Sequence, residues 1–198
     1  MPPIVLDIET QNTFADVEND FKKLRVSVVS IFRYDCDQYL SFVESELNKL
    51  WPFLEKADFI IGYNSEHFDM RVLNNYYVGD LLTFSHLDLM KRIKASIGIS
   101  LRLNDVAAAT LDMEKSADGF KAIQWWKEGK IDEIKKYCEQ DVLITKELYE
   151  FGKNNRQLFH KSLTGEIIPF AVDFTMTQTG ESPSAQLAKG KINMTLPL

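Results

Sequence analysis

Two acidic residues, Asp7 and Glu9, lie in an otherwise apolar segment near the start of the chain. Residues 3–9 (PIVLDIE) alternate with the period of a β-strand, so both acids are expected to point to the same side. Two carboxylates on one face repel each other and are costly to bury unless a cation lies between them. Metal binding would explain the pattern, but an edge strand with a solvated face would carry the same acids, so this spacing alone does not decide between them.

A third acid, Asp69, follows the apolar segment DFIIGYN at residues 58–64, which predicts a short buried strand. Asp69 would then begin a helix at the carboxyl end of that strand, where α/β proteins tend to place ligand sites. An acid in the first turn of a helix also has an ordinary structural use as a cap or dipole partner. Both interpretations remain open for Asp69 on its own.

Tyr137 and Asp141 are four residues apart in the most regular helical segment, which runs from Ile131 to about Gly152. This spacing puts the phenol and the carboxylate on one helix face, next to the apolar stripe. Tyr76 and Asp80 have the same spacing, but Gly79 makes a helix there less favourable. The pair at 137 and 141 is therefore the better candidate.

Acids that converge from distant segments would suit the hydrolysis of a phosphodiester. Cleavage without a covalent intermediate needs an activated water and relief of charge on the leaving oxygen, which two cations about 3.5–4 Å apart supply together. Mg²⁺ prefers carboxylate and water oxygens in octahedral geometry. A site of this kind would hold two divalent cations, Mg²⁺ or Mn²⁺.

The elements that would position these residues follow from hydrophobic periodicity. Two β-rich runs, 25–34 and 38–43, predict an antiparallel meander with the first strand. A helix over 44–56, restarted at Pro52, precedes the strand in 58–64. Further helices are expected over four segments before the long final one: 66–77, 87–97, 103–111 and 116–127. This order predicts an α/β fold with one mixed sheet, three antiparallel strands and then parallel ones, flanked by helices.

Three segments together resemble a known family. D-I-E-T at 7–10, G-Y-N-S-E-H-F-D at 62–69 and Y-C-E-Q-D at 137–141 look like the three exonuclease motifs of the DEDD superfamily. The resemblance covers about residues 3–150. It is closest to the tyrosine-bearing DEDDy branch of these DnaQ-like enzymes, which includes family B polymerase proofreading domains and bacterial RNase H-like exonucleases often linked to helicases.

The resemblance implies a ribonuclease H-like fold, with Asp7, Glu9, Asp69 and Asp141 as metal-binding acids. Tyr137 matches the family tyrosine that orients the water attacking the terminal phosphate. Three further residues are candidate substrate contacts: Thr10 at the terminal 3′-hydroxyl, Asn64 at the substrate or a ligand, and Phe68 stacked on the last base. Thr10 could instead cap a turn, and Phe68 could belong to the core.

Composition sets the remaining limits. The 198 residues, 45% of them hydrophobic, are enough for one globular exonuclease domain, expected at residues 1–155, with a peripheral hairpin or linker at 156–198. The net charge of −6 argues against broadly electrostatic nucleic-acid binding, although two bound cations would bring it to about −2. No apolar run is long enough for a membrane helix and the start lacks a signal pattern, so we expect a cytoplasmic protein with no membrane contact.

Several other residues could have either a functional or a structural role. Trp125 and Trp126 could stack on bases, or they could stabilise the packing between the final helix and the helix before it. The basic patch could steer a phosphate backbone, or form a solvated helix face; it consists of Lys91, Arg92, Lys94 and Arg102. Asp88 is expected to be structural. The two cysteines and the three scattered histidines predict neither a disulfide framework nor a zinc site.

Three hypotheses follow. The leading one is 3′-to-5′ hydrolysis of single-stranded DNA to nucleoside 5′-monophosphates, in which only the likeness to family B polymerases favours DNA. An exoribonuclease remains open, because discrimination depends on contacts to the 2′-hydroxyl that no motif reveals. A catalytically silent nucleic-acid-binding module is the alternative from another class. A helicase or polymerase partner is conceivable under each of them.

Overall fold

The computed structural model describes residues 2–113 and 119–176. Within them, one five-stranded sheet has the order β3-β2-β1-β4-β5. β1 (Ile4–Thr10), β2 (Val26–Arg33) and β3 (Gln38–Val43) pair antiparallel. β4 (Ile60–Gly62) and β5 (His86–Asp88) continue the sheet in parallel on the other side of β1. The mixed sheet predicted from the sequence is confirmed, and β1 lies at its centre.

The alternation in β1 gives its two faces different partners. Ile4, Leu6 and Ile8 enter one apolar cluster with the helices that follow β3 and β4. Val5 enters a second cluster with the long final helix. Asp7 and Glu9 share the face of Val5, since successive strand residues point to opposite sides. The pairing register with β2 shifts between Glu9 and Thr10, an irregularity that bends a strand and redirects its side chains.

The helices flank the sheet. The α-helices are α1 (Trp51–Lys56), α2 (Asp69–Leu73), α3 (Leu89–Ile97), α4 (Leu103–Leu111), α5 (Gly119–Lys127) and α6 (Ile131–Asn155). Short 3₁₀ helices lie in the connections, at Ala15–Val17, Phe21–Lys23, Glu44–Lys49 and Leu81–Thr83. Pro52 stands in the first turn of α1, where its missing N–H costs nothing, so the predicted restart is confirmed.

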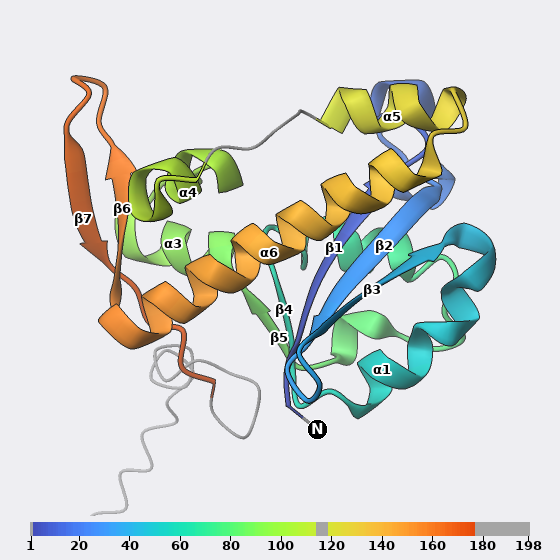
Figure 1. The fold of residues 1–198 in the computed structure, drawn as a ribbon, viewed down its shortest axis with the longest axis horizontal. Helices are drawn as coiled ribbons and strands as arrows, with labels where there is room; N and C mark the ends of the chain where they lie inside the picture. Colours follow the sequence, from blue (N-terminus) through green and yellow to red (C-terminus); the bar gives the residue numbers. More distant parts are fainter. Residues whose placement is uncertain (1, 114–118, 177–198) are drawn as a thin grey trace, which may run out of the picture.

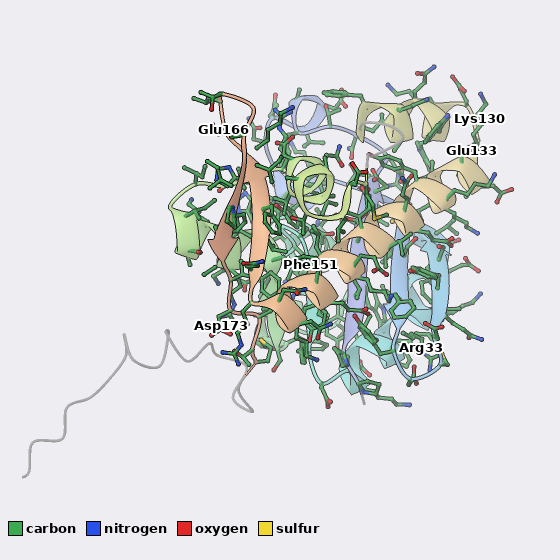
Figure 2. The ribbon with its side chains drawn as sticks, turned by 60° about the vertical axis from the view of Figure 1, so that its left-hand side comes forward. Arg33, Lys130, Glu133, Phe151, Glu166 and Asp173 are labelled. Carbon is green, nitrogen blue, oxygen red and sulfur yellow. The ribbon has the colours of Figure 1, made fainter. Side chains whose placement is uncertain are left out.

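α6 crosses one face of the sheet diagonally, over β1 and β2 (Figure 1). α5 packs at its N-terminal end, against both α6 and β1. At its C-terminal end a hairpin of β6 (Gln157–Lys161) and β7 (Ile167–Ala171) packs on α4 and α6. Figure 2 shows the two ends, with Lys130 and Glu133 at one and Phe151 near the other, and Glu166 at the hairpin tip.

Some elements differ from the prediction. β5 occupies residues predicted to begin a helix, because its strand character comes from pairing with β4. α2 is shorter than predicted, and β6, which pairs with β7 in a hairpin, was not predicted. Part of the predicted helix 116–127 and everything after residue 176 lie outside the described residues. Among the helices that are described, none combines the length and apolar character needed to cross a bilayer.

Candidate metal centre and adjoining clefts

Three of the predicted acids converge where α6 crosses β1. Asp7, Glu9 and Asp141 each offer a carboxylate oxygen, and these three atoms lie within 4.8 Å of one another. Asp7 and Glu9 come from the α6-facing side of the central strand, and Asp141 is buried on α6. Three carboxylates at this separation in a partly dehydrated position repel one another strongly, which a bound cation would relieve.

The helix contributes a second contact at the same place. Cys138, fully buried, directs its Sγ toward Asp7, at 3.3 Å from the main-chain oxygen and 3.5 Å from Oδ2. Burial, together with the negative charges of Asp7 and Glu9, keeps the pKa of this thiol well above its ordinary value. The neutral thiol is thus a weak donor to Asp7, and it was not recognised from the sequence as more than a core residue.

Asp69 approaches β1 from the loop that follows β4. It is the first residue of α2, it is buried, and its Oδ1 accepts a hydrogen bond of 3.2 Å from the Ile8 amide. Burial, with smaller contributions from the charges of Asp88 and Asp141, raises the pKa of Asp69 to about 8. Asp69 is not one of the three acids whose oxygens meet within 4.8 Å.

Tyr137 lies one helical turn before Asp141, on the buried side of α6. Its ring meets Trp125 of α5 edge to face, with centroids 6.1 Å apart. Trp125 and Trp126 both pack against the cluster formed by Val28, Ala122 and the first turns of α6. The two tryptophans therefore stabilise the packing of α5 against α6, which is the structural one of the two interpretations.

An apolar cleft of about 710 Å³ opens next to Glu9. Thr10 and Phe68, two of the predicted substrate contacts, line it. Phe68 meets the ring of Phe14 at 5.6 Å, so it also belongs to an aromatic cluster. The hydroxyl of Thr10 donates to the carbonyl of Asn12 at 2.9 Å, which is the turn-capping role weighed from the sequence. Both residues thus combine a structural contact with a place on the cleft wall.

Other residues that line this cleft come from segments that the motifs do not include. Phe120 and Ile123 project from α5, and Arg102 immediately precedes α4. Phe120 is 75% exposed, which is unusual for a large aromatic side chain and marks it as available for contact. The sequence identified Arg102 only as part of the basic patch, and no local signal distinguishes Phe120 or Ile123.

Asn64, the third predicted substrate contact, lies on a different groove. This groove, of about 460 Å³, is lined by Asn64, His67 and several residues of α3. Asn64 adopts a left-handed conformation with φ of 60°, which asparagine tolerates better than most residues. Its backbone N–H donates a hydrogen bond to Asp88 Oδ1 at 2.9 Å. Asn64 is therefore part of a loop held by Asp88 and does not line the cleft beside Glu9.

Asp88 is structural, as expected from the sequence. Its carboxylate accepts hydrogen bonds from the amides of Asn64, Glu66 and Lys91, which ties the 64–68 loop to the start of α3. This carboxylate therefore sets the course of the chain between β4 and Asp69.

His67 and His86 contact residues outside the acid trio, whereas Cys138 packs against Asp7. His86 bonds Ser65 at 2.7 Å, and His67 meets the Phe21 ring. Cys36 and Cys138 are free thiols, one exposed and one buried. Within residues 2–113 and 119–176, the acid trio is the group of side chains whose ligand atoms meet closely enough to share a metal ion.

The donor set fits a hard divalent cation. All of the converging ligand atoms are carboxylate oxygens, which Mg²⁺ and Mn²⁺ prefer over the nitrogen and sulfur ligands typical of zinc. The acids also belong to the central strand and the long final helix, whose positions are fixed by packing on both sides. A cation held there would be accessible from the cleft, because Glu9 contributes to both.

A family model described as the RNase H superfamily matches residues 4–151, about three quarters of the chain. The chain belongs to the RNase H superfamily. The match runs from β1 to the last turns of α6, so it contains every proposed metal-binding acid and Tyr137. The ribonuclease H-like fold expected from the motif resemblance is thereby confirmed. No curated protein sequence matches the chain significantly.

Solved structures share the fold at low sequence identity. The family B DNA polymerase of the hyperthermophilic archaeon Pyrobaculum calidifontis matches with a TM-score of 0.59 and 18% identity, over 76% of this chain and 24% of the polymerase. The zinc-bound complex of E. coli ExoI with single-stranded DNA matches with a TM-score of 0.48 and 16% identity, over 78% of this chain and 41% of ExoI. The chain thus spans well under half of either protein, and the first match supports the fold alone.

Proposed function

We propose that the chain is a metal-dependent 3′-to-5′ exonuclease that releases nucleoside 5′-monophosphates from single-stranded DNA. The convergence of Asp7, Glu9 and Asp141 within 4.8 Å, at the crossing of β1 and α6, carries the proposal. The buried Asp69, hydrogen-bonded to the β1 backbone, supports it. Membership of the RNase H superfamily and the order of the three DEDD-like motifs are consistent with the same chemistry.

Asp7, Glu9, Asp69 and Asp141 would hold two divalent cations, Mg²⁺ or Mn²⁺. When bound, such cations lower the pKa of a coordinated water and neutralise charge on the phosphate and the leaving oxygen. The carboxylates themselves fix where this positive charge lies relative to the cleft. Because they come from β1, α2 and α6, their positions depend on tertiary packing, and not on a flexible loop.

Tyr137 has the role of orienting the attacking water. Its phenol lies on the same helix face as Asp141, and the edge-to-face contact with Trp125 restricts its ring. In the reaction the water oxygen bonds to phosphorus and loses its proton, while the bond between phosphorus and the 3′-oxygen of the preceding nucleotide breaks. That oxygen takes up a proton and leaves as a new 3′-hydroxyl.

The apolar cleft beside Glu9 is proposed to hold the terminal nucleotide. Phe68 offers a ring for stacking on the last base, an interaction that tolerates any base. Thr10 and Glu9 lie where the terminal 3′-hydroxyl would enter, and Asn64 is proposed to act through the loop that carries Phe68 and Asp69. A base bound in this cleft is unpaired, which is why we propose a single-stranded end as substrate.

Digestion of a 5′-labelled and a 3′-labelled single strand with Mn²⁺ tests the proposal. A 3′-to-5′ exonuclease shortens the 5′-labelled strand stepwise and releases the 3′ label first as mononucleotide. Asp7→Ala should abolish both signals, which excludes a contaminating nuclease. An intact strand with either label, in Mg²⁺ and in Mn²⁺, would rule out the enzyme and leave the nucleic-acid-binding module.

Matched DNA and RNA strands in one reaction determine the sugar. Faster loss of the DNA strand would support the proposed substrate, whereas faster loss of the RNA strand would make the chain an exoribonuclease with the same site. Calorimetry separates the silent module from the enzyme, because oligonucleotide binding by a silent module should not depend on a divalent cation.

A further inference from the structure

The second groove adjoins the cleft of the proposed active site. The 64–68 loop borders both hollows, with Phe68 on the cleft and Asn64 and His67 on the groove. The segment before α4 also borders both, with Arg102 on the cleft and Ser100 on the groove. Two separate segments thus form the shared rim, so a strand of nucleic acid that leaves the cleft over this rim enters the groove.

Basic side chains gather on the wall of this groove. Arg71 from α2 and Lys91 and Lys94 from α3 line it, and all three side chains are exposed. The acids on its wall are Glu66, paired with Lys91, and Asp88, whose carboxylate is occupied by three backbone amides. Formal charges on the wall therefore sum to about +1, with His67 neutral, in a chain whose net charge is −6.

The basic patch noted in the sequence is divided by the fold. Lys91 and Lys94 face the groove, and Arg102 faces the cleft. Arg92 is partly buried, and its guanidinium lies 3.7 Å from the sulfur of Met176, in the segment after β7. Arg92 therefore belongs to the packing of the C-terminal segment, and the remaining cations follow the rim from the cleft to the groove.

We propose that this groove holds the backbone phosphates of the single strand upstream of the nucleotide being removed. The assignment rests on the exonuclease function proposed above, because it takes the cleft as the place of the 3′ end. Exposed lysines contact phosphates without reading sequence, which suits an enzyme that must accept any strand. His67, exposed on the rim with its ring against Phe21, lies where the strand would cross between the two hollows.

Binding of a fluorescent 20-nucleotide oligo(dT), measured by anisotropy in Ca²⁺ to suppress turnover, tests the groove. The double variant Lys91→Gln/Lys94→Gln should raise the Kd about 10-fold at moderate salt. The slope of log K against log salt should fall by about 0.7 for each phosphate that the variant no longer neutralises, so by about 1.4 in total. Both lysines are exposed, so the folded state should tolerate the change.

The control is Lys56→Gln/Lys161→Gln, which removes the same charge from α1 and β6. It should change the Kd by less than about two-fold, because neither lysine lines the groove. Two results would contradict the proposed role of the groove: equal effects of the two double variants, or a loss of affinity for a blunt duplex of the same length equal to the loss for the single strand. Either result would mean general attraction of a polyanion.

Hydrolysis of the dinucleotide dTpdT separates this inference from the proposed function. A dinucleotide has no upstream phosphate, so the groove variant should cleave it with the kcat/KM of the unmodified chain. Loss of dinucleotide cleavage in the groove variant alone would place the lysines in the active site and overturn the groove. If neither protein cleaves it, digestion of the labelled single strand decides the exonuclease proposal, and the binding comparison still decides whether the groove holds a strand.

Discussion

Asp69 is a buried carboxylate at the start of α2. Burial, and the charges of Asp88 and Asp141, raise its pKa to about 8, far above that of an acid in an unfolded chain. In the metal-free protein Asp69 is therefore largely protonated at neutral pH. If Asp69 is a metal ligand, as proposed, metal binding releases this proton, and we expect affinity for Mn²⁺ to rise as the pH increases toward 8.

The raised pKa makes Asp69 a source of pH-dependent instability. Between about pH 4 and pH 8 the unfolded chain has already lost the proton that the folded chain keeps, so this residue lowers the stability of the metal-free protein as pH rises. Asp69→Asn retains an acceptor for the Ile8 amide and removes the titration. We expect it to stabilise the metal-free protein by up to about 5 kcal/mol at pH 7.5 and by up to about 1.5 kcal/mol at pH 5, while abolishing activity.

Urea unfolding in EDTA at pH 5 and pH 7.5 measures the difference in the free energy of unfolding between Asp69→Asn and the unmodified chain. Asp37→Asn is the control, because Asp37 is exposed in the β2–β3 turn and its left-handed conformation suits asparagine. It should change stability by less than about 0.5 kcal/mol at either pH. A destabilised Asp69→Asn protein at pH 7.5 would show that the carboxylate is ionised and stabilised without metal.

Tyr137→Phe tests the second role assigned to α6. Loss of the hydroxyl should lower kcat about 100-fold and leave Mn²⁺ affinity unchanged, because the four carboxylates remain. Tyr149→Phe is a matched control on the same helix, since Tyr149 is also buried but stacks on Phe174. Single-turnover hydrolysis of a short DNA strand compares the cleavage rates of the two variants. Equal kcat in the two variants would remove Tyr137 from the mechanism.

At the scale of elements, the connection between β4 and α2 determines where Asp69 lies. Asp88 at the end of β5 accepts three backbone hydrogen bonds, two from the 64–68 loop and one from the first turn of α3. Gly62 permits the close turn, because a Cβ at this position would lie 2.2 Å from Ser65 Oγ. A residue far from the acid trio in sequence thus controls the position of the fourth acid.

Asp88→Ala should therefore both destabilise the fold and weaken metal binding. Loss of a helix cap and of two loop hydrogen bonds is expected to cost about 2–3 kcal/mol. Asp80→Ala removes a comparable but exposed cap at a short 3₁₀ helix, with one bond to Leu82, and should cost about 1 kcal/mol or less. Thermal unfolding with and without Mn²⁺ compares the two. Unaltered Mn²⁺ affinity in Asp88→Ala would show that the loop does not position Asp69 for the metal.

Elements with strong local patterns were predictable, and those formed by pairing were not. The alternation in β1 placed Asp7 and Glu9 on one face, and the period of α6 placed Tyr137 and Asp141 together. β5 is three residues long and β6 contains His160 and Lys161, so neither carries a recognisable strand pattern. Their strand conformation comes from the neighbours with which they pair.

The same limit applies to the candidate site. Its acids were found because carboxylates in apolar segments are unusual, and the motif order gave them a common interpretation. The cleft walls at Phe120, Ile123 and Arg102 arise from the packing of α5 and of the segment before α4 around β1, which no local pattern specifies. The contact of Cys138 with Asp7 depends likewise on how α6 crosses the sheet.

For the whole molecule, the proposed metal centre would make stability depend on divalent cations. A ligand that binds only the folded state at 100 times its Kd stabilises it by about 2.7 kcal/mol. Saturating Mn²⁺ should therefore raise the melting temperature by several degrees, and the Asp7→Asn/Asp141→Asn variant should lose most of this increase. Differential scanning fluorimetry in Mn²⁺ and in EDTA measures it. An equal increase in both proteins would place the stabilising cation elsewhere.

The most direct test of the account is calorimetric titration of Mn²⁺ into the unmodified chain and into Asp141→Asn, a buried and nearly isosteric change within the trio. We expect measurable binding to the unmodified chain and at least about a 10-fold weaker affinity in the variant, with a parallel loss of exonuclease activity. Binding of undiminished affinity to Asp141→Asn would contradict the assignment of these carboxylates as the metal centre.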